Sequence, residues 1–274
     1  VWLHNSLEYL NKQISGNLVF FKGLPLEIFE TLIDRFDVRS ISWNRSYEPN
    51  DLESDIIIKK KLRQNVDNVK SFNGSLLWEP SEVLKNDSTP YKVFTPFYKK
   101  GCLNRPPPRQ PETKKVKKIF DSFKSNSLES LNLVPKKKWV LNVKNEWKIG
   151  EEYAQELMNS FFKYGLKDYK EGRNFPEKKN VSRLSPYIHW GQISPNTLWH
   201  NVQNLEKNND SNENIETFKS ELGWREFSYY LLYHFPQIIN KNLQSKFDNF
   251  GWEENEEYFK LWKTGKTGYP IVDA

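Results

Sequence analysis

Residues 221–236 of this 274-residue chain read ELGWREFSYYLLYHFP, a stretch that combines helical spacing with many aromatic rings. At about 100° per residue, a helix here has two neighbouring stripes of different character. The polar and aromatic stripe contains Glu221, Trp224, Arg225 and Ser228. The mainly apolar stripe, expected to face a core, contains Phe227, Tyr230, Leu231 and His234. The polar stripe is typical of a platform that stacks a planar ring, but a Glu–Arg pair covering a half-buried Trp is favoured on these residues alone.

Helical spacing continues on both sides of this stretch. The segments with helical character are 151–165, 194–206, 215–235 and 254–264, separated by turn-like pieces. No segment beyond Gly150 has the alternation or the short apolar run of a strand. An all-α domain is therefore predicted for this part of the chain.

The first half of the chain alternates helices with short apolar runs. Residues 3–14 place apolar side chains on one helical face, and GNLVFFKG at 16–23 predicts a buried strand. A helix with Pro25 near its start follows, and VRSISWN at 38–44 predicts a second strand. This α-β-α-β order predicts a parallel sheet with crossover helices, and the opening helix implies a strand lost upstream.

Between these halves, residues 99–145 have the composition of a connection. The stretch NRPPPRQPETKKVKK at 104–118 has prolines and lysines but no periodic apolar face. We therefore predict a long interdomain linker here. Its lysine runs are most often solvated surface, and only their summed charge would matter to a nucleic acid.

Composition suits a polyanionic partner and argues against several classes of protein. The net charge of +6 suits a polyanionic partner, although basic proteins without such a partner are common. Aromatic residues make up 15% of the chain, which suggests stacking on planar rings, although an aromatic-rich core explains part of this content. The single cysteine excludes an internal disulfide framework and a cysteine-based zinc site. No stretch approaches a membrane span, and the first residues do not resemble a signal peptide. We expect a cytoplasmic protein with no membrane partner.

Motifs for metal or hydrolytic chemistry lack their usual support. The stretch TGKTGYP at 264–270 resembles a phosphate-binding loop, but that motif needs a glycine at position 260, which is Lys. The four histidines share no close metal-ligand spacing, so no metal site is predicted. No Ser-His-Asp arrangement can be inferred from distances along the sequence.

The stretch VSRLSPYIHWGQISP at 181–195 is more informative. Ser182 and Ser185 supply hydroxyl groups and Arg183 a charge, just before a helix entry marked by Pro186. Such groups suit a phosphate, but ordinary capping of a helix by Ser and Pro is the more common explanation. Upstream, YKEGRNFP at 169–176 offers Tyr and Arg side chains in a glycine-containing segment, which is a weak signal by itself.

Taken together, six stretches in this order and spacing resemble the photolyase/cryptochrome family, most closely the class I cyclobutane pyrimidine dimer photolyases. They are WNRSYEP (43–49), YKVFTPFYK (91–99), GRNFP (172–176), SRLSPYIHWGQISP (182–195), ELGWREF (221–227) and GKTGYPIVDA (265–274). The similarity covers essentially the whole chain, and the last three stretches are highly specific in combination.

The resemblance implies an α/β N-terminal domain with a parallel, Rossmann-like sheet that is missing its first strand, followed by an all-α FAD-binding domain that is truncated. The corresponding boundaries are 1–98 for the antenna domain, 99–145 for the linker and 146–274 for the helical domain. It also implies light-driven electron transfer from reduced FAD to a thymine dimer flipped out of UV-damaged DNA. Such a carbon–carbon lyase needs no nucleophile or metal.

The resemblance also assigns roles to residues that match the family's motifs. FAD contacts are implied for Tyr169, Val181, Ser182, Arg183, Leu184, Ser185, Phe218 and Arg225, with the two serines near the phosphates. Catalysis on the dimer is implied for Glu221, which would hydrogen-bond the thymine, and Trp224, which would stack on it. DNA contacts are implied for Arg173, Glu221, Trp224, Arg225 and Ser228.

Some positions depart from the family's pattern. Val181 stands where the family usually has Thr, and Phe218 where it often has Trp. Asn50 and Asp51 lie where folate-binding members place an Asn and a Glu, so an antenna such as methenyltetrahydrofolate or a deazaflavin is expected there. The first residue is Val and the chain ends at GYPIVDA, before the family's redox-tuning Asn and tryptophan chain, so we expect this fragment alone to be inactive.

Three functions are compatible with these features. A dimer photolyase, acting as a monomer on UV-damaged DNA, is favoured by Glu221 and Trp224, because a receptor has no need to stack on a dimer. A cryptochrome-like blue-light photoreceptor that signals through a protein partner would keep the flavin. A non-catalytic nucleic-acid-binding module would be colourless.

Overall fold

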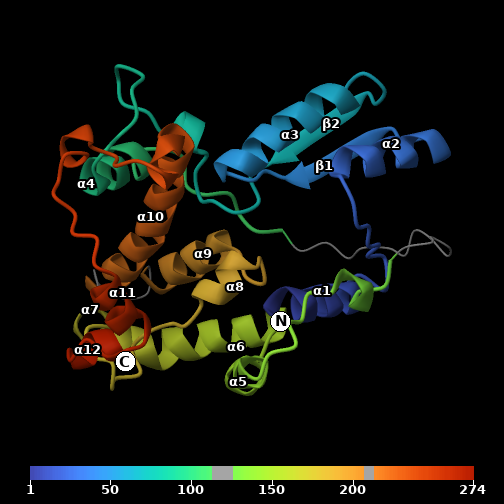
Figure 1. Cartoon of the computed structure of the whole chain (residues 1–274). Coiled ribbons are helices and arrows are strands. Elements are labelled where there is room, and N and C mark those ends of the chain that lie inside the picture. Colours follow the sequence, from blue (N-terminus) through green and yellow to red (C-terminus); the bar gives the residue numbers. More distant parts are fainter. Residues whose placement is uncertain (113–125, 207–212) are drawn as a thin grey trace. The chain divides into compact units, whose positions relative to one another are not determined.

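The computed structural model describes residues 1–112, 126–206 and 213–274 (Figure 1). Its contacts divide the chain into two compact units, Val1–His234 and Phe235–Ala274. The division reflects how densely the residues contact one another, and it does not test the domain boundaries predicted near residues 98 and 146, which stay a prediction. Part of the predicted linker, residues 113–125, lies outside the described residues.

The α/β part of the first unit is a small parallel sheet with two helices packed on it. Its helices and strands are α2 (Pro25–Arg35), β1 (Ser40–Asn44), α3 (Pro49–Leu62) and β2 (Asn68–Phe72). The preceding helix α1 (Trp2–Gln13) packs instead on the helical part of the unit, where Trp2 contacts Trp147 and Tyr187. The two strands run parallel, with Ser40 opposite Asn68 and Asn44 opposite Phe72, and α3 connects them (Figure 1). The small core between sheet and helices centres on Leu62, Val66 and Val69. The predicted α/β class with a parallel sheet is therefore confirmed.

The predicted strand at residues 16–23 is wrong. In the structure this segment has one isolated antiparallel bridge, from Phe20 to Asn126, and no strand of its own. Phe21 is partly exposed, so the apolar run does not enter a core here. A strand needs a neighbour for its backbone groups, and the parallel pair β1–β2 is not extended by this segment in the described residues.

The remainder of the first unit is built from helices and turns, which agrees with the prediction beyond Gly150, whereas the helix at Trp139–Glu146 lies within the predicted linker. The helices are α4 (Phe94–Pro96), α5 (Trp139–Glu146), α6 (Glu151–Ser160), α7 (Tyr169–Gly172), α8 (Ser185–His189), α9 (Pro195–Glu206) and α10 (Glu213–His234). Short 3-10 turns lie at Pro80–Glu82, Glu129–Leu131 and Leu166–Asp168, and π-helical turns at Phe97–Cys102 and Phe161–Gly165. Beyond Gly150, the described residues contain no strand.

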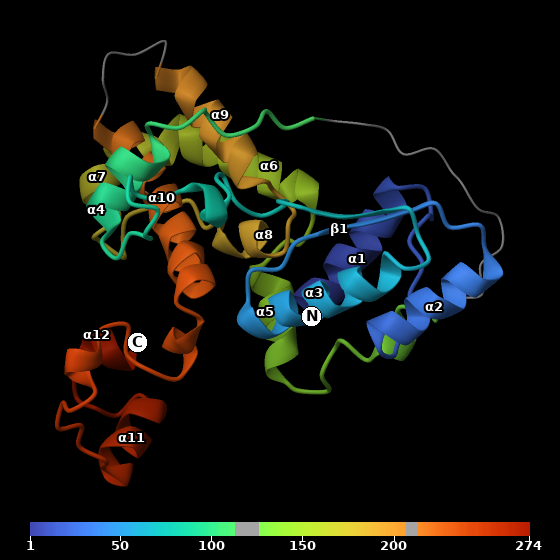
Figure 2. The same cartoon turned by 90° about the horizontal axis from the view of Figure 1, so that it is seen from above.

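Helix α10 is the centre of the helical core. It packs against α7, α9 and the π-helical turn Phe97–Cys102 (Figure 2). The close approach to that turn depends on Gly223, because a Cβ atom there would lie 2.6 Å from the Tyr98 ring. Phe227 and Tyr230 are buried on the same side. The stripe predicted to face a core therefore does so at these two positions.

The second unit, Phe235–Ala274, contains α11 (Glu256–Lys263), α12 (Pro270–Asp273) and 3-10 turns at Pro236–Ile239 and Ser245–Phe247. Asn255 caps α11 by accepting hydrogen bonds from the amides of Glu257 and Tyr258. The TGKTGYP segment is closed by Asp273, whose carboxylate accepts from the amides of Thr267 and Gly268, both at 2.8 Å. These amides serve a local turn, which agrees with the failure of the phosphate-loop motif.

Candidate functional site

One face of α10 borders a cavity of about 410 Å³, here called the α10 cavity. Its lining residues are Tyr169, Ser182, Leu184, Ser185, Ile188, His189, Leu198, Phe218, Glu221, Leu222, Arg225 and Tyr229. They come from α7, α8, α9, α10 and the segment before α8. The structure thus brings together seven of the residues singled out from the sequence, which lie up to 56 positions apart.

The inner wall of the cavity is aromatic and rigid. Phe218 is buried and meets the Tyr169 ring edge-on, with centroids 5.6 Å apart and planes at 80°. The Phe161 ring packs against both of these rings, with its centroid 5.1 Å from that of Phe218 and 5.5 Å from that of Tyr169. Edge-to-face packing of this kind holds ring planes in place. One wall of the cavity is therefore formed by packed aromatic rings, and polar side chains such as Ser182, Ser185 and Glu221 line the rest with other residues.

A polar group at the rim consists of Tyr169, Arg173 and Glu221. The Arg173 guanidinium pairs with the Glu221 carboxylate and lies 5.6 Å from the centre of the Tyr169 ring. The hydrogen bond to Glu221 raises the pKa of Arg173, and burial raises the pKa of the Tyr169 phenol. Both charged side chains remain about one third exposed. They can therefore exchange this ion pair for contacts with a ligand.

A third charged side chain at the cavity, Arg225, is paired with Glu226, a residue that sequence reasoning missed. Its guanidinium donates to Glu226 at 2.8 Å and lies 5.0 Å from the centre of the Tyr229 ring. Glu226 is 3% exposed and also accepts from the amide of Leu77 at 2.7 Å. Burial raises the pKa of Glu226 to about 7. Its signal in the sequence was an acidic side chain four residues after Leu222 and four before Tyr230, between two apolar residues on the same side of the helix.

Trp224 lies on α10 outside the cavity lining and is 47% exposed. One face of its indole stacks on Phe94, with centroids 3.8 Å apart and planes within 11°. Phe94 in turn stacks on Tyr98 at 5.5 Å. The indole therefore sits at the outer end of an aromatic column. Ser228, also predicted for the site, donates its hydroxyl to the Trp224 carbonyl oxygen at 3.1 Å.

Phe94 is a second residue to which sequence reasoning gave no role, although it lies within the quoted stretch at 91–99. It is 130 positions from Trp224 along the chain. No local periodicity links two residues at such a separation, so the sequence contained no signal for this stack.

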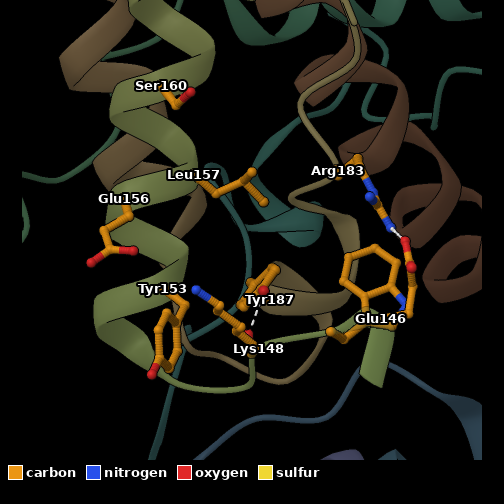
Figure 3. A pocket seen from close by; sticks show the side chains of 9 residues that line it. Glu146, Lys148, Tyr153, Glu156, Leu157, Ser160, Arg183 and Tyr187 are labelled. Carbon is orange, nitrogen blue, oxygen red and sulfur yellow. Dashed lines mark hydrogen bonds and ion pairs between the residues drawn. The ribbon is translucent and has the colours of Figure 1, made fainter. Parts of the chain in front are cut away.

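Two residues of the 181–185 segment do not line the α10 cavity. Val181 is half exposed, and the Arg183 side chain extends to Glu146 and Trp147 at a separate pocket (Figure 3). Arg183 also has a positive φ of 54°. Its neighbours Ser182, Leu184 and Ser185 do line the cavity.

The predicted antenna residues are at the first turn of α3. Asp51 lines a cavity of about 530 Å³ that is bordered by α2, β1 and α3, and its carboxylate accepts from the Ser46 hydroxyl at 3.2 Å. Asn50 is exposed and does not line this cavity.

Over the described ranges, no three His, Cys, Asp or Glu side chains gather in a way that could hold a metal ion. Nor is any helix there both long and apolar enough to cross a bilayer. His200, one of the four histidines, is instead engaged with the carbonyl oxygen of Pro108 at 2.9 Å.

Comparison with known proteins gives matches at both ends of the chain. A family model for DNA photolyase matches residues 1–114, and one for the FAD binding domain of DNA photolyase matches residues 218–274. A deoxyribodipyrimidine photo-lyase from Agrobacterium fabrum is 39% identical over the whole chain. Cryptochrome-2 from Arabidopsis thaliana is 29% identical over the whole chain. A solved class III photolyase from Agrobacterium tumefaciens is 36% identical over 99% of the chain, with a TM-score of 0.88.

The chain belongs to the photolyase/cryptochrome family. It spans 58% of the length of the Agrobacterium fabrum relative, 47% of the cryptochrome and 57% of the solved class III chain. The predicted family is therefore confirmed. The motifs most resemble class I enzymes, whereas this structural relative is described as class III.

Proposed function

We propose that the protein is a light-dependent DNA repair enzyme that splits cyclobutane pyrimidine dimers, with FAD bound in the α10 cavity. The observation that carries the proposal is the position of Glu221, which lines the cavity while Trp224, three residues later, presents an aromatic face outside it. A lesion and a cofactor can thus be held from the same helix. Family membership supports both the cofactor and the reaction.

The residues of the α10 cavity fit such a cofactor. Phe218 and Leu222 offer apolar surface to a flat ring, and Tyr169, Ser182 and Ser185 offer hydroxyl groups to polar parts of the ligand. Arg225 adds a positive charge that suits an anion. FAD, when bound and reduced, supplies the electron on absorbing light. The protein's part is to bind, to orient and to exclude water.

Glu221, Trp224 and Arg173 are proposed to hold the lesion. Trp224 stacks on the flipped-out dimer, and the Glu221 carboxylate accepts a hydrogen bond from a pyrimidine N–H. Arg173 is ion-paired with Glu221 in this structure and contacts the DNA backbone in the complex. An ion pair that is one third exposed is weak enough to be exchanged in this way.

Photoreception through a protein partner is the second candidate, favoured by the cryptochrome relative. The test uses the full-length protein and a dimer-containing oligonucleotide. We expect a purified protein with a flavin absorption spectrum that restores intact thymines under blue light and not in the dark. Flavin without repair would favour the photoreceptor, and a colourless protein would contradict both readings.

An antenna chromophore is proposed for the cavity beside Asp51. The cavity has apolar sides from Leu26, Phe29 and Ile58 and polar groups from Asn44 and Asp51. A folate such as methenyltetrahydrofolate or a deazaflavin combines ring and polar groups in this way. Fluorescence of the full-length protein distinguishes such a chromophore from FAD.

The substrate is proposed to be UV-damaged DNA, bound by a cytoplasmic monomer. The net charge of +6 supports binding to a polyanion, and the resulting affinity should fall as salt is raised.

Glu221→Ala is expected to lower the repair yield per absorbed photon by about tenfold, while affinity for damaged DNA falls less. The hydrogen bond should strengthen as charge develops on the dimer, and partial exposure keeps the effect below that of an enclosed site. The measurement is the quantum yield of repair at saturating DNA. Glu221→Gln keeps an oxygen acceptor without the charge and serves as the control. An unchanged yield in the alanine variant would mean that Glu221 only anchors the helix.

A further inference from the structure

Arg183 has a backbone conformation that is unfavourable for its residue type. Its φ of 54° lies in the left-handed region, where the Cβ atom of an L-residue comes close to the next carbonyl oxygen. Glycine adopts this conformation without that contact. A non-glycine residue keeps it at a binding site only when the surrounding structure holds it there. The contacts of the Arg183 side chain should therefore show what holds the backbone in this conformation.

Those contacts lie on the side of the chain that does not line the α10 cavity. The guanidinium is 4.3 Å from the centre of the Trp147 ring and donates to the Glu146 carboxylate at 2.7 Å (Figure 3). Trp147 is itself packed edge-on against Trp2, with centroids 5.4 Å apart. The ion pair is exposed, at 47% for the Arg183 side chain and 62% for that of Glu146, so by itself it contributes little. The main support of the Arg183 side chain is therefore the contact of its guanidinium with the face of the Trp147 indole.

The residues beside Arg183 line the α10 cavity. Ser182 and Ser185 contribute to its lining, and Leu184 between them is buried in the core. The turn at Arg183 thus presents its neighbours to the cavity while its own side chain lines the separate pocket with Trp147.

We propose that Arg183 is a positioning residue that does not touch the cofactor. Stacking on Trp147 and pairing with Glu146 stabilise the left-handed turn, and the turn sets Ser182 and Ser185 along the α10 cavity. This inference rests on the proposed function, in which that cavity binds FAD. It differs from the role that the resemblance implies for Arg183, a direct contact with the cofactor.

Glycine and alanine at this position separate the two roles. Arg183→Ala keeps the conformational cost of the left-handed turn and loses its support, so flavin affinity of the full-length protein should fall by about tenfold. Arg183→Gly loses the same side chain but removes the cost, so affinity should stay within about threefold of the parent. The measurement is titration of the apoprotein with FAD, followed by fluorescence.

The support itself is tested by Trp147→Ala, made both in the parent and in Arg183→Gly. In the parent this change should weaken flavin binding by about tenfold, and in the glycine background by no more than about threefold, because contacting residues couple. The loss that remains in the glycine background comes from the contacts of Trp147 with Trp2 and Tyr187. Equal losses in Arg183→Gly and Arg183→Ala would overturn the proposal and indicate direct contact with the ligand. Unchanged affinity in both Arg183→Ala and Trp147→Ala would overturn it too.

Hydrogen exchange in the apoprotein keeps the test independent of the cofactor. Trp147→Ala should speed exchange of the amides at 182–185 in the parent by about tenfold, and much less in Arg183→Gly. A parent that binds no flavin would contradict the proposed function, while this exchange pattern would still support the role of Arg183. Equal acceleration in both backgrounds would overturn that role whether or not flavin binds.

Discussion

Glu226→Ala is expected to lower the free energy of unfolding by about 3–5 kcal/mol. The Glu226 carboxylate is buried and accepts hydrogen bonds from the amide of Leu77 at 2.7 Å and the amide of Trp78 at 3.4 Å. It also pairs with Arg225 at 2.8 Å. Alanine would leave two buried amides and a guanidinium without this partner. The cost of such groups exceeds the value of the ion pair itself.

Denaturation by urea, followed by circular dichroism, measures this loss. Glu8→Ala is a matched control, because Glu8 pairs with Lys12 on an exposed face of α1 and its loss should cost less than about 1 kcal/mol. Glu226→Gln should lie between the two, since an amide oxygen can still accept from the backbone. A loss below about 1 kcal/mol in Glu226→Ala would show that water replaces the carboxylate in these contacts.

The same residue predicts a pH dependence of stability. Burial raises the pKa of Glu226 from 4.5 to about 7, so the folded state favours the protonated acid more than the unfolded chain does. The resulting stabilisation is fully present below pH 4.5 and is lost as pH rises through 7. Relative to Glu226→Gln, the parent should lose about 3 kcal/mol of unfolding free energy between pH 4.5 and 8. Parallel pH profiles for the two proteins would contradict this sign.

The sequence predicted those parts of the structure that depend on local spacing. A helix over 215–235 and its buried face follow from residues three and four positions apart, and α10 spans Glu213–His234. The strand predicted at 16–23 failed because an apolar run specifies burial but not a partner strand. Pairing is a long-range property, and among the described residues this segment forms only a bridge to Asn126.

The missed parts of the site involve contacts between distant segments. Glu226 meets Leu77 across 149 positions, and Trp224 meets Phe94 across 130. Arg183 illustrates a different limit. The resemblance implies a direct cofactor contact for it, which stays a prediction, and the sign of its backbone angle cannot be seen in the letters SRLS. The family resemblance assigned these segments to one site, and the structure shows which of their residues line the cavity.

Trp224→Ala in the full-length protein is expected to weaken binding of dimer-containing DNA by about 1–3 kcal/mol, or roughly 5- to 150-fold in the dissociation constant. The indole already stacks on Phe94 with one face and remains 47% exposed. Its plane is therefore set before a base arrives, which lowers the cost of ordering it on binding. Flavin content should not change, because Trp224 does not line the α10 cavity.

Competition binding with damaged and undamaged duplexes of the same sequence isolates the stacking contribution. Undamaged DNA is held mainly through its phosphates, so Trp224→Ala should bind it as the parent does. Trp224→Phe keeps an aromatic face and should retain most of the preference for damage. Phe94→Leu leaves the indole in place without its stacked partner, so an intermediate loss is expected there if the prior ordering of the ring matters. Equal affinity of the parent and Trp224→Ala for dimer-containing DNA would mean that the lesion is held elsewhere on the protein, and that this aromatic column serves only to pack α10 against the turn at Phe97–Cys102.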